Sequence, residues 1–298
     1  MRHHGDLRRP WRRTRFWVGV AIGSVLLLTG VSVIGAVAAL SVADIAATVS
    51  EPTPRGAEPD QSGDEAGNAA AALSYVALGD SFAAGLGGGD SAGACQRGTE
   101  SYPQLLGAVT GIDLTADATC SGAVTADVGE QLAVVSAATT LVTLTVGVND
   151  LDFMSVVDAC LQPSGGGCQA DIDAAADLLG SGALGDRLNA VYAQIAAAAP
   201  NARTVVTGYP YLYAPSSDPL VTQLNAATAA LNLTIRGAVT QAQVQRPEAN
   251  IDFVDVTGAF AGHGINDADP WISDTGIGAF HPTVAGYAAY ATVVRSTL

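Results

Sequence analysis

Lysine is absent from this chain of 298 residues, whose 13 basic side chains are all arginine. Without a lysine amine, the chain cannot form a lysine Schiff base, bind phosphate through a P-loop lysine or use a serine–lysine dyad. Arginine is also scarce in residues 44–298, where seven arginines stand against 27 acidic residues. Phosphate contacts need basic patches, so we expect no nucleic-acid partner.

Aromatic residues are few as well, at 6%, although 49% of the residues are apolar. Alanine and glycine supply much of this apolar share. The composition is typical of a packed globular core and argues against a disordered chain. The length is enough for one well-filled α/β domain with appendages.

The first 43 residues combine a basic head with a long uncharged run. They hold six arginines and one acidic residue, and residues 16–43 carry no charge. As a helix that rises about 1.5 Å per residue, this run would exceed the roughly 30 Å hydrocarbon core of a bilayer. The basic flank predicts that the head stays in the cytoplasm and that the rest lies outside. Residues 1–43 are therefore a signal anchor in the membrane or a signal peptide cleaved near residues 36–38. We expect the remaining chain to be secreted or held on the outer face of the cytoplasmic membrane.

Residues 44–72 are rich in Pro, Gly, Ala, Ser and acidic side chains, which is typical of a flexible linker. Residues 73–298 form the expected folded domain. Within it, apolar runs at residues 73–78, 112–115, 140–148, 203–209 and 251–256 predict strands. Helical spacing recurs over residues 178–195, 224–235 and 285–294, and glycines at 180–185 leave open whether the first stretch is one helix or two. Strands that alternate with helices predict an α/β fold with a central parallel sheet, whose reactive groups gather beyond the carboxyl ends of its strands.

The four cysteines, Cys95, Cys120, Cys160 and Cys168, form an even set in a chain that is expected to leave the cytoplasm. Disulfides are therefore expected, and a metal site is the rival reading, although no Cys-x-x-Cys spacing occurs. Three pairings are possible. A bond between Cys160 and Cys168 would close a short Gly-rich loop and would leave Cys95 to pair with Cys120.

Ser81 lies in the sequence GDSFAAG (residues 79–85), directly after the first predicted strand. It is either a nucleophile that points into the crevice or an ordinary helix N-cap. A serine nucleophile needs a base, and only two histidines lie beyond the N-terminal head. His281 stands in FHPT (residues 280–283) before the last predicted helix, whereas His263 lies in a Gly-rich loop and reads as a surface histidine.

Acyl transfer also needs hydrogen-bond donors aimed at the developing oxyanion. Gly122, in CSGA (residues 120–123), can offer a backbone N–H, and Asn149, in GVND (residues 147–150), can offer a side-chain amide. Each could also be a plain turn residue. Asp80 and Asp150 read as structural residues that cap and fix loops.

Taken together, GDSFAAG, CSGA, GVND and FHPTVAGY resemble the ordered sequence blocks of the SGNH/GDSL hydrolase family. The resemblance runs from about Ser74 to the C-terminus, and the Ala-rich composition with its expected disulfides resembles the secreted actinobacterial lipases and esterases. It implies a flavodoxin-like three-layer α/β/α fold. It further implies that Ser81 is the nucleophile, that His281 is the general base, and that the oxyanion hole is formed by Ser81, Gly122 and Asn149.

One position departs from the family pattern. The family usually has an aspartate three residues before the histidine, and here that residue is Gly278. Because some members orient the histidine with a main-chain carbonyl, the Gly278 carbonyl is the first candidate for this role. Asp274 is the second, since the Gly-rich segment 275–278 could let it fold back.

The expected function is an exported serine ester hydrolase that works through an acyl-enzyme and needs no metal or organic cofactor. Lipid or acylglycerol esters are the expected substrates, and the chain is expected to be a monomer. The alternatives are a deacetylase of acetylated envelope or plant polysaccharide and a catalytically weak envelope-binding domain of the same fold.

Overall fold

The strand-forming runs assemble into a five-stranded parallel sheet in the computed structural model, which describes residues 71–161 and 167–298. Its strands are β1 (Leu73–Gly79), β4 (Ile112–Asp117), β5 (Leu141–Thr145), β6 (Arg203–Thr207) and β7 (Ile251–Val254). They lie in the order β4-β1-β5-β6-β7. With the strands counted along the chain this is the flavodoxin-like order 2-1-3-4-5. The predicted sheet is confirmed.

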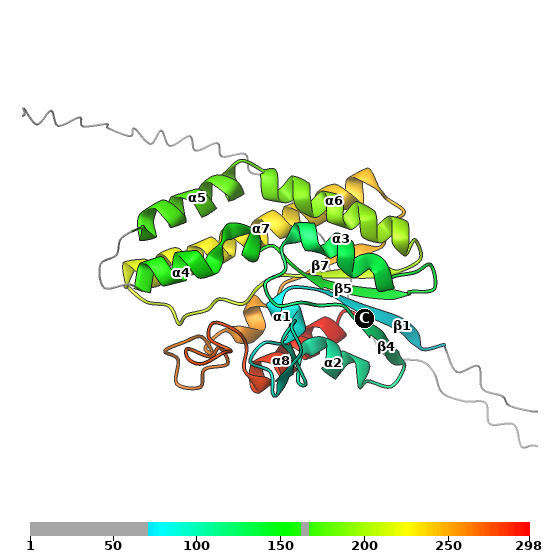
Figure 1. Cartoon of the computed structure of the whole chain (residues 1–298), viewed down its shortest axis with the longest axis horizontal. Coiled ribbons are helices and arrows are strands. Elements are labelled where there is room, and N and C mark those ends of the chain that lie inside the picture. The colour runs from blue at the N-terminus through cyan, green and yellow to red at the C-terminus, as the bar shows by residue number, and fades with distance from the viewer. Residues whose placement is uncertain (1–70, 162–166) are drawn as a thin grey trace, which may run out of the picture. The chain divides into compact units, whose positions relative to one another are not determined.

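Helices cover both faces of the sheet and complete three layers (Figure 1). On one face lie α2 (Tyr102–Gly107) and α8 (Val284–Arg295). The other face carries α3 (Val128–Gln131), α4 (Phe153–Leu161), α5 (Cys168–Gly180), α6 (Ala183–Ala198) and α7 (Pro219–Gln245). The break between α5 and α6 settles the open question about residues 178–195 in favour of two helices. The smaller elements are α1 (Ser81–Ala84), a hairpin of β2 (Ser91–Ala92) and β3 (Arg97–Gly98), and the short 3-10 turns η1 (Thr125–Asp127), η2 (Leu132–Val134), η3 (Asn149–Leu151) and η4 (Thr257–Phe260).

Helix α7 is much longer than the predicted stretch 224–235. Asp218 caps its N-terminus by accepting hydrogen bonds from the N–H groups of Leu220 and Val221, and Pro219 occupies the first turn, where no N–H is needed. Beyond the predicted stretch, buried residues such as Val239 and Ala242 continue the core-facing stripe. Capping and tertiary packing, rather than local pattern, therefore set the length of this helix.

A ladder of buried hydroxyl groups joins α2 and α8 to the sheet. The Tyr102 hydroxyl lies 2.9 Å from Thr145 Oγ1, which lies 2.6 Å from Thr207 Oγ1. Tyr290 donates to the same Thr207 hydroxyl at 2.7 Å. Its ring stacks on that of Tyr102, with 4.7 Å between the two ring centroids. Because every one of these buried groups is paired, the ladder fixes α8 against the strands without leaving a polar group unsatisfied.

The described part of the chain contains two disulfide bonds. Cys95, in the β2–β3 hairpin, pairs with Cys120, and Cys160 of α4 pairs with Cys168 of α5. The described part of the chain has no free cysteine.

The predicted membrane segment, in residues 1–43, and nearly all of the predicted linker 44–72 lie outside the described residues. Within residues 71–161 and 167–298, no helix combines the length and the apolar character needed to cross a membrane.

The backbone of Gly79, at the end of β1, lies so close to β5 that no side chain fits between them. We therefore expect Gly79→Ala to lower the free energy of unfolding by about 3 kcal/mol or more. Its φ is +125°, and a Cβ atom there would overlap the backbone carbonyl of Thr145. Chemical denaturation of the purified variant measures the loss. Gly180→Ala is the matched control, since a Cβ atom at Gly180 meets open space, and it should be neutral or slightly stabilising. Equal effects of the two substitutions would contradict this account of Gly79.

Candidate active site

Ser81 stands where the strand order of the sheet reverses. It follows β1, which pairs with β4 on one side and with β5 on the other. In doubly wound sheets this switch point, at the carboxyl ends of the strands, opens the crevice in which ligands bind. Asp80 caps α1 through a 2.9 Å bond from the Phe82 N–H. The strand and its cap thus place the Ser81 side chain at the edge where the segments after β4 and β5 also emerge.

His281 meets Ser81 from 200 residues away in the chain. Its Nε2 lies 2.7 Å from Ser81 Oγ, and both residues are more than 90% buried. The predicted nucleophile and the predicted base are therefore in direct contact. The Phe82 ring packs against the imidazole, with 4.8 Å between the ring centroids and a tilt of 38° between the ring planes.

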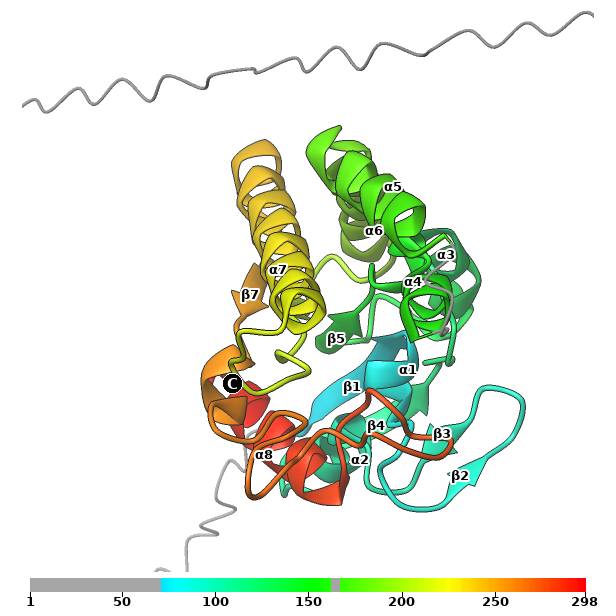
Figure 2. The ribbon, with the colours of Figure 1, turned by 90° about the vertical axis from the view of Figure 1, so that its left-hand side faces the viewer.

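A closed loop before α8 holds His281 in this position. Ile272 and Pro282 form a β-bridge, and Ser273 exchanges backbone hydrogen bonds with Phe280 and His281. Thr283 then caps α8. Figure 2 shows this orange-to-red loop passing in front of α1 before the chain enters α8. Tyr290 fixes α8 to the sheet. The loop that carries His281 is therefore held both by its own bridge between Ile272 and Pro282 and by the helix that follows it.

The orienting partner of His281 differs from both predicted candidates. Its Nδ1 lies 2.8 Å from the carbonyl oxygen of Ala279. The Gly278 carbonyl instead accepts the backbone N–H of His281 at 3.0 Å, because Gly278 begins the turn that His281 ends. Asp274 is solvent-exposed, and no hydrogen bond joins it to His281 in the described part of the chain. In the structure, His281 Nδ1 thus faces the main-chain carbonyl of Ala279 and not that of Gly278.

The Ala279 contact fixes the tautomer of the imidazole. A carbonyl oxygen can only accept, so Nδ1 must carry the hydrogen and Nε2 is left with a lone pair that faces the Ser81 hydroxyl. Burial lowers the pKa of His281 from its ordinary value to about 4, a shift that the Ala279 hydrogen bond partly opposes. The imidazole is therefore neutral near pH 7 and ready to accept a proton.

Gly122 and Asn149, the predicted oxyanion-hole donors, lie in the segments that follow β4 and β5, the two strands that pair with β1. The Asn149 amide nitrogen donates one hydrogen to the carbonyl of Ala123 at 2.9 Å, which leaves its second hydrogen for a ligand. Gly122 has a φ of +86°, which suits glycine, and open space lies where a Cβ atom would stand. The hydrogen bond between Asn149 and Ala123 thus ties the segment after β4 to the segment after β5.

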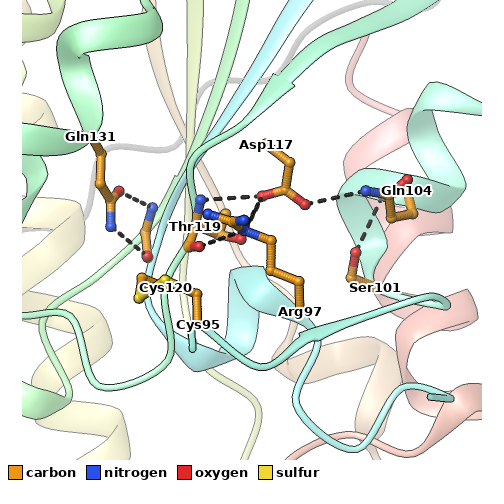
Figure 3. A network of polar contacts seen from close by, with 9 residues as sticks. Cys95, Arg97, Ser101, Gln104, Asp117, Thr119, Cys120 and Gln131 are labelled. Atoms are coloured by element: carbon orange, nitrogen blue, oxygen red, sulfur yellow. Dashed lines mark hydrogen bonds and ion pairs between the residues drawn. A yellow bond between two sulfur atoms is a disulfide. The ribbon is translucent and has the colours of Figure 1, made fainter. Parts of the chain in front are cut away.

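Side chains from several elements hold the Gly122 segment in place (Figure 3). Gln131 bonds to both the N–H and the carbonyl of Gly79, at 2.7 and 2.9 Å, and the same carbonyl accepts the Cys120 N–H at 2.9 Å. Arg97 donates to the Thr119 carbonyl at 2.8 Å and pairs with Asp117 at 3.6 Å. Together with the Cys95–Cys120 bond, these contacts fix the backbone that leads to Gly122.

The Asn149 segment is anchored through its neighbour Asp150. This carboxylate accepts hydrogen bonds from the N–H and the hydroxyl of Thr125, at 2.9 and 2.7 Å, and pairs with Arg187 at 3.1 Å. Asp150 therefore lies in a structural network, as we expected. The predicted surface histidine, His263, stacks on Trp271 with 3.5 Å between the ring centroids, and its Nδ1 donates to the Asp269 carbonyl at 2.8 Å.

Tyr209 is a residue of the site that the sequence did not single out. Its hydroxyl donates to the Asp80 carboxylate at 2.6 Å and accepts the N–H of Val148 at 3.2 Å. Burial raises the pKa of Asp80 to about 7, while the hydrogen bonds from Tyr209 and Phe82 oppose the shift. The only sequence signal was the position of Tyr209, two residues beyond the end of β6.

In the described residues, no three His, Cys, Asp or Glu side chains are grouped as metal ligands. The site contains a serine hydroxyl hydrogen-bonded to a neutral imidazole. That set can carry out nucleophilic acyl transfer.

Comparison with known proteins points to the same chemistry. Residues 77–289 match the GDSL-like lipase/acylhydrolase family. The chain is 36% identical over 241 residues to Lipase 1 of Streptomyces coelicolor, covering 74% of this chain and 85% of that protein. Among solved structures, phospholipase A1 from Streptomyces albidoflavus is 35% identical with a TM-score of 0.67, and the extracellular lipase from Streptomyces rimosus is 33% identical with the same score. Each alignment covers 76% of this chain and all of the other.

The low pKa of His281 predicts that its imidazole stays neutral well below pH 6 and takes up a proton only near pH 4. An NMR titration can follow this, with His281→Gln used to assign the resonance. The unfolded chain protonates the same side chain near its ordinary pKa of about 6.5. The free energy of unfolding should therefore fall, relative to His281→Gln, by up to about 3 kcal/mol as the pH drops from about 7 toward 4. A His281 resonance that titrates near pH 6.5 would contradict the burial effect.

Proposed function

The chain belongs to the GDSL-like lipase/acylhydrolase family and is a carboxylic ester hydrolase, and from that premise we propose that it is exported and cleaves lipid or acylglycerol esters through an acyl-enzyme on Ser81. The observation that carries the proposal is the 2.7 Å contact between Ser81 Oγ and an imidazole whose other nitrogen faces a carbonyl. This contact supplies a nucleophile together with a base in the required tautomer.

In the proposed reaction, His281 Nε2 accepts the Ser81 proton as Oγ attacks the ester carbonyl carbon. The oxyanion of the tetrahedral intermediate accepts hydrogen bonds from the Ser81 N–H, the Gly122 N–H and the free amide hydrogen of Asn149. The Ser81 N–H is in the first turn of α1, where the helix offers it no partner. The carbon–oxygen bond to the alcohol then breaks, and the alcohol leaves with the proton from His281.

Water completes the cycle. His281 takes a proton from a water molecule that attacks the acyl-enzyme, and the proton is returned to Ser81 as the carboxylic acid leaves. The imidazolium that forms in each half-reaction faces the neutral Ala279 carbonyl rather than a carboxylate. The base is therefore weaker than one paired with aspartate, but it remains deprotonated over a wider range of pH.

Two observations support an extracellular lipid ester hydrolase. The two disulfides are of the kind that persists in an oxidising compartment. The similar proteins named above are lipases and a phospholipase A1, one of them extracellular. A membrane anchor within residues 1–43 stays a prediction from the sequence.

Removing the nucleophile should abolish turnover, because the acyl-enzyme cannot form without Oγ. We expect Ser81→Ala of the full-length chain to lower kcat for p-nitrophenyl esters by about 10⁴-fold or more. Ser91→Ala, at an exposed serine of β2, is the matched control and should behave as wild type. Acyl chains from acetate to laurate give the length preference, which separates an acetyl esterase from a lipase. A Ser81→Ala chain that still turns over esters at the wild-type rate would refute the mechanism.

The role of Asn149 predicts a selective effect on the transition state. Asn149→Ala should lower kcat by about 10²- to 10³-fold while KM changes little, since an oxyanion donor acts mainly on the charge that develops during attack. Thermal unfolding of the variant checks that losing the bond to Ala123 has not released the loop. A loss of kcat below threefold in a folded variant would exclude Asn149 from the oxyanion hole.

A further inference from the structure

Phe280, the residue before His281, has an unusual backbone conformation. Its φ is +65°, in the left-handed region that bulky side chains avoid. In the described part of the chain, the other non-glycine residues with positive φ are Gln96, Asp152 and Asn266. Asparagine and aspartate enter this region more readily, because their short polar side chains can form local hydrogen bonds. Phenylalanine has no such side chain, so the surrounding structure must hold the backbone of Phe280 in place.

The backbone at Phe280 sets the direction of one peptide unit. Rotation about its N–Cα bond turns the plane that contains both the Ala279 carbonyl and the Phe280 N–H. Both groups have partners. The N–H donates to the carbonyl of Ser273 at 2.7 Å, and the Ala279 carbonyl oxygen lies 2.8 Å from Nδ1 of His281. A negative φ at Phe280 would turn this plane and separate the carbonyl from the imidazole.

The packing of its side chain holds Phe280 in this conformation. Phe280 is only 8% exposed. Its ring meets that of Phe153, the first residue of α4, edge to face, with 6.3 Å between the ring centroids. Rotation about φ would also swing the side chain, so a change of backbone conformation would take the ring out of this apolar contact.

A second contact, between Gly87 and Gly278, holds the start of the same turn. A Cβ atom at Gly278 would stand 2.7 Å from the Cα atom of Gly87, well inside the contact distance of about 3.5 Å. The two backbones therefore touch with no room for a side chain at Gly278. Tyr287 of α8 donates to the carbonyl of Leu86 at 3.1 Å and so fixes the segment that carries Gly87. An aspartate at position 278, as in the family pattern, would push the turn away from this segment.

We propose that Phe280 is a positioning residue of the reaction, whose left-handed backbone aims the Ala279 carbonyl at His281. Phe153 and the contact between Gly87 and Gly278 hold it in that conformation. The proposal rests on the proposed function, in which His281 is the base, and deepens it by naming what fixes the orienting carbonyl. A carbonyl held in this way orients the imidazole without a buried charge beside it.

Substitutions at Phe280 separate the effect of the backbone from that of the ring. Asparagine, alanine and valine all remove the ring, but asparagine tolerates a positive φ best and β-branched valine least. We expect kcat for p-nitrophenyl acetate to fall in the order Asn, Ala, Val at similar KM, with Phe280→Val about tenfold or more below Phe280→Asn. If Phe280→Val does not fold, the comparison of Phe280→Ala with Phe280→Asn decides. Equal kcat values in the folded variants would show that only the ring matters and would overturn the proposal.

The imidazole gives a readout that does not depend on turnover. In the ¹⁵N NMR spectrum of the histidine-labelled full-length chain at pH 7, we expect His281 to carry its hydrogen on Nδ1, and Phe280→Val to show a mixture of both tautomers. If Ser81→Ala hydrolyses esters as fast as the wild type but Phe280→Val changes the tautomer, the proposed function fails and the positioning of the imidazole stands. If Ser81→Ala is inactive but Phe280→Val keeps the wild-type tautomer, the positioning role is overturned and the proposed function stands.

Gly278→Asp restores the aspartate of the family pattern and tests the contact with Gly87. We expect kcat to fall by about tenfold or more, because the new side chain displaces the turn that carries the Ala279 carbonyl. Gly258→Asp is the matched control and should keep the wild-type kcat, since Gly258 is exposed and a Cβ atom there meets open space. A Gly278→Asp chain as active as the wild type would overturn the proposal, because His281 would then be oriented without the closely packed turn.

Discussion

The carboxyl group of Asp80 is the interaction on which the rest of the site depends. It is fully buried, caps α1 through the Phe82 N–H, and accepts the hydroxyl of Tyr209. Tyr209 in turn accepts the N–H of Val148, and Asn232 of α7 bonds to both its backbone N–H and its carbonyl at 2.8 Å. One buried group thereby joins the turn that presents Ser81, the segment that carries Asn149, and the long helix α7. Burying it raises its pKa to about 7, so the position is held at an electrostatic cost that the fold offsets with hydrogen bonds.

His281 is oriented without a second buried carboxylate. Buried charges are expensive unless they are fully paired, and Asp80 already occupies the interior close to Ser81. The Ala279 carbonyl performs the orienting task as a neutral acceptor, and it does so because the bridge between Ile272 and Pro282 closes the loop around it. The result is an imidazole with a low pKa, held by geometry more than by charge. The same loop leads into α8, whose Tyr290 ties it to the hydroxyl ladder on the sheet.

The two faces of the sheet serve different purposes. On the α2 and α8 face, paired tyrosine and threonine hydroxyls make a rigid, fully satisfied interior that supports the base. On the other face, residues of α4, α5 and α7 line an apolar groove of about 560 Å³. The base is thus supported from the polar side of the sheet, whereas the opposite side presents an open apolar surface.

The sequence by itself determined the elements and the order of the chemistry along the chain. Apolar runs located the strands, and the turn after each strand located Ser81, Gly122 and Asn149, because strand period and turn residues are local properties. Ser81 and His281 could be paired in advance because few histidines were available and because their sequence blocks resemble a known family. Tertiary structure alone decided which carbonyl meets Nδ1, since Gly278 and Ala279 adjoin in the chain and only the closure of the loop turns one toward the backbone and the other toward the ring. It also decided that Tyr209 bonds to Asp80, 129 residues away, and that α5 and α7 leave a groove between them. Contacts of this kind depend on how distant elements pack, and no local pattern in the sequence encodes them.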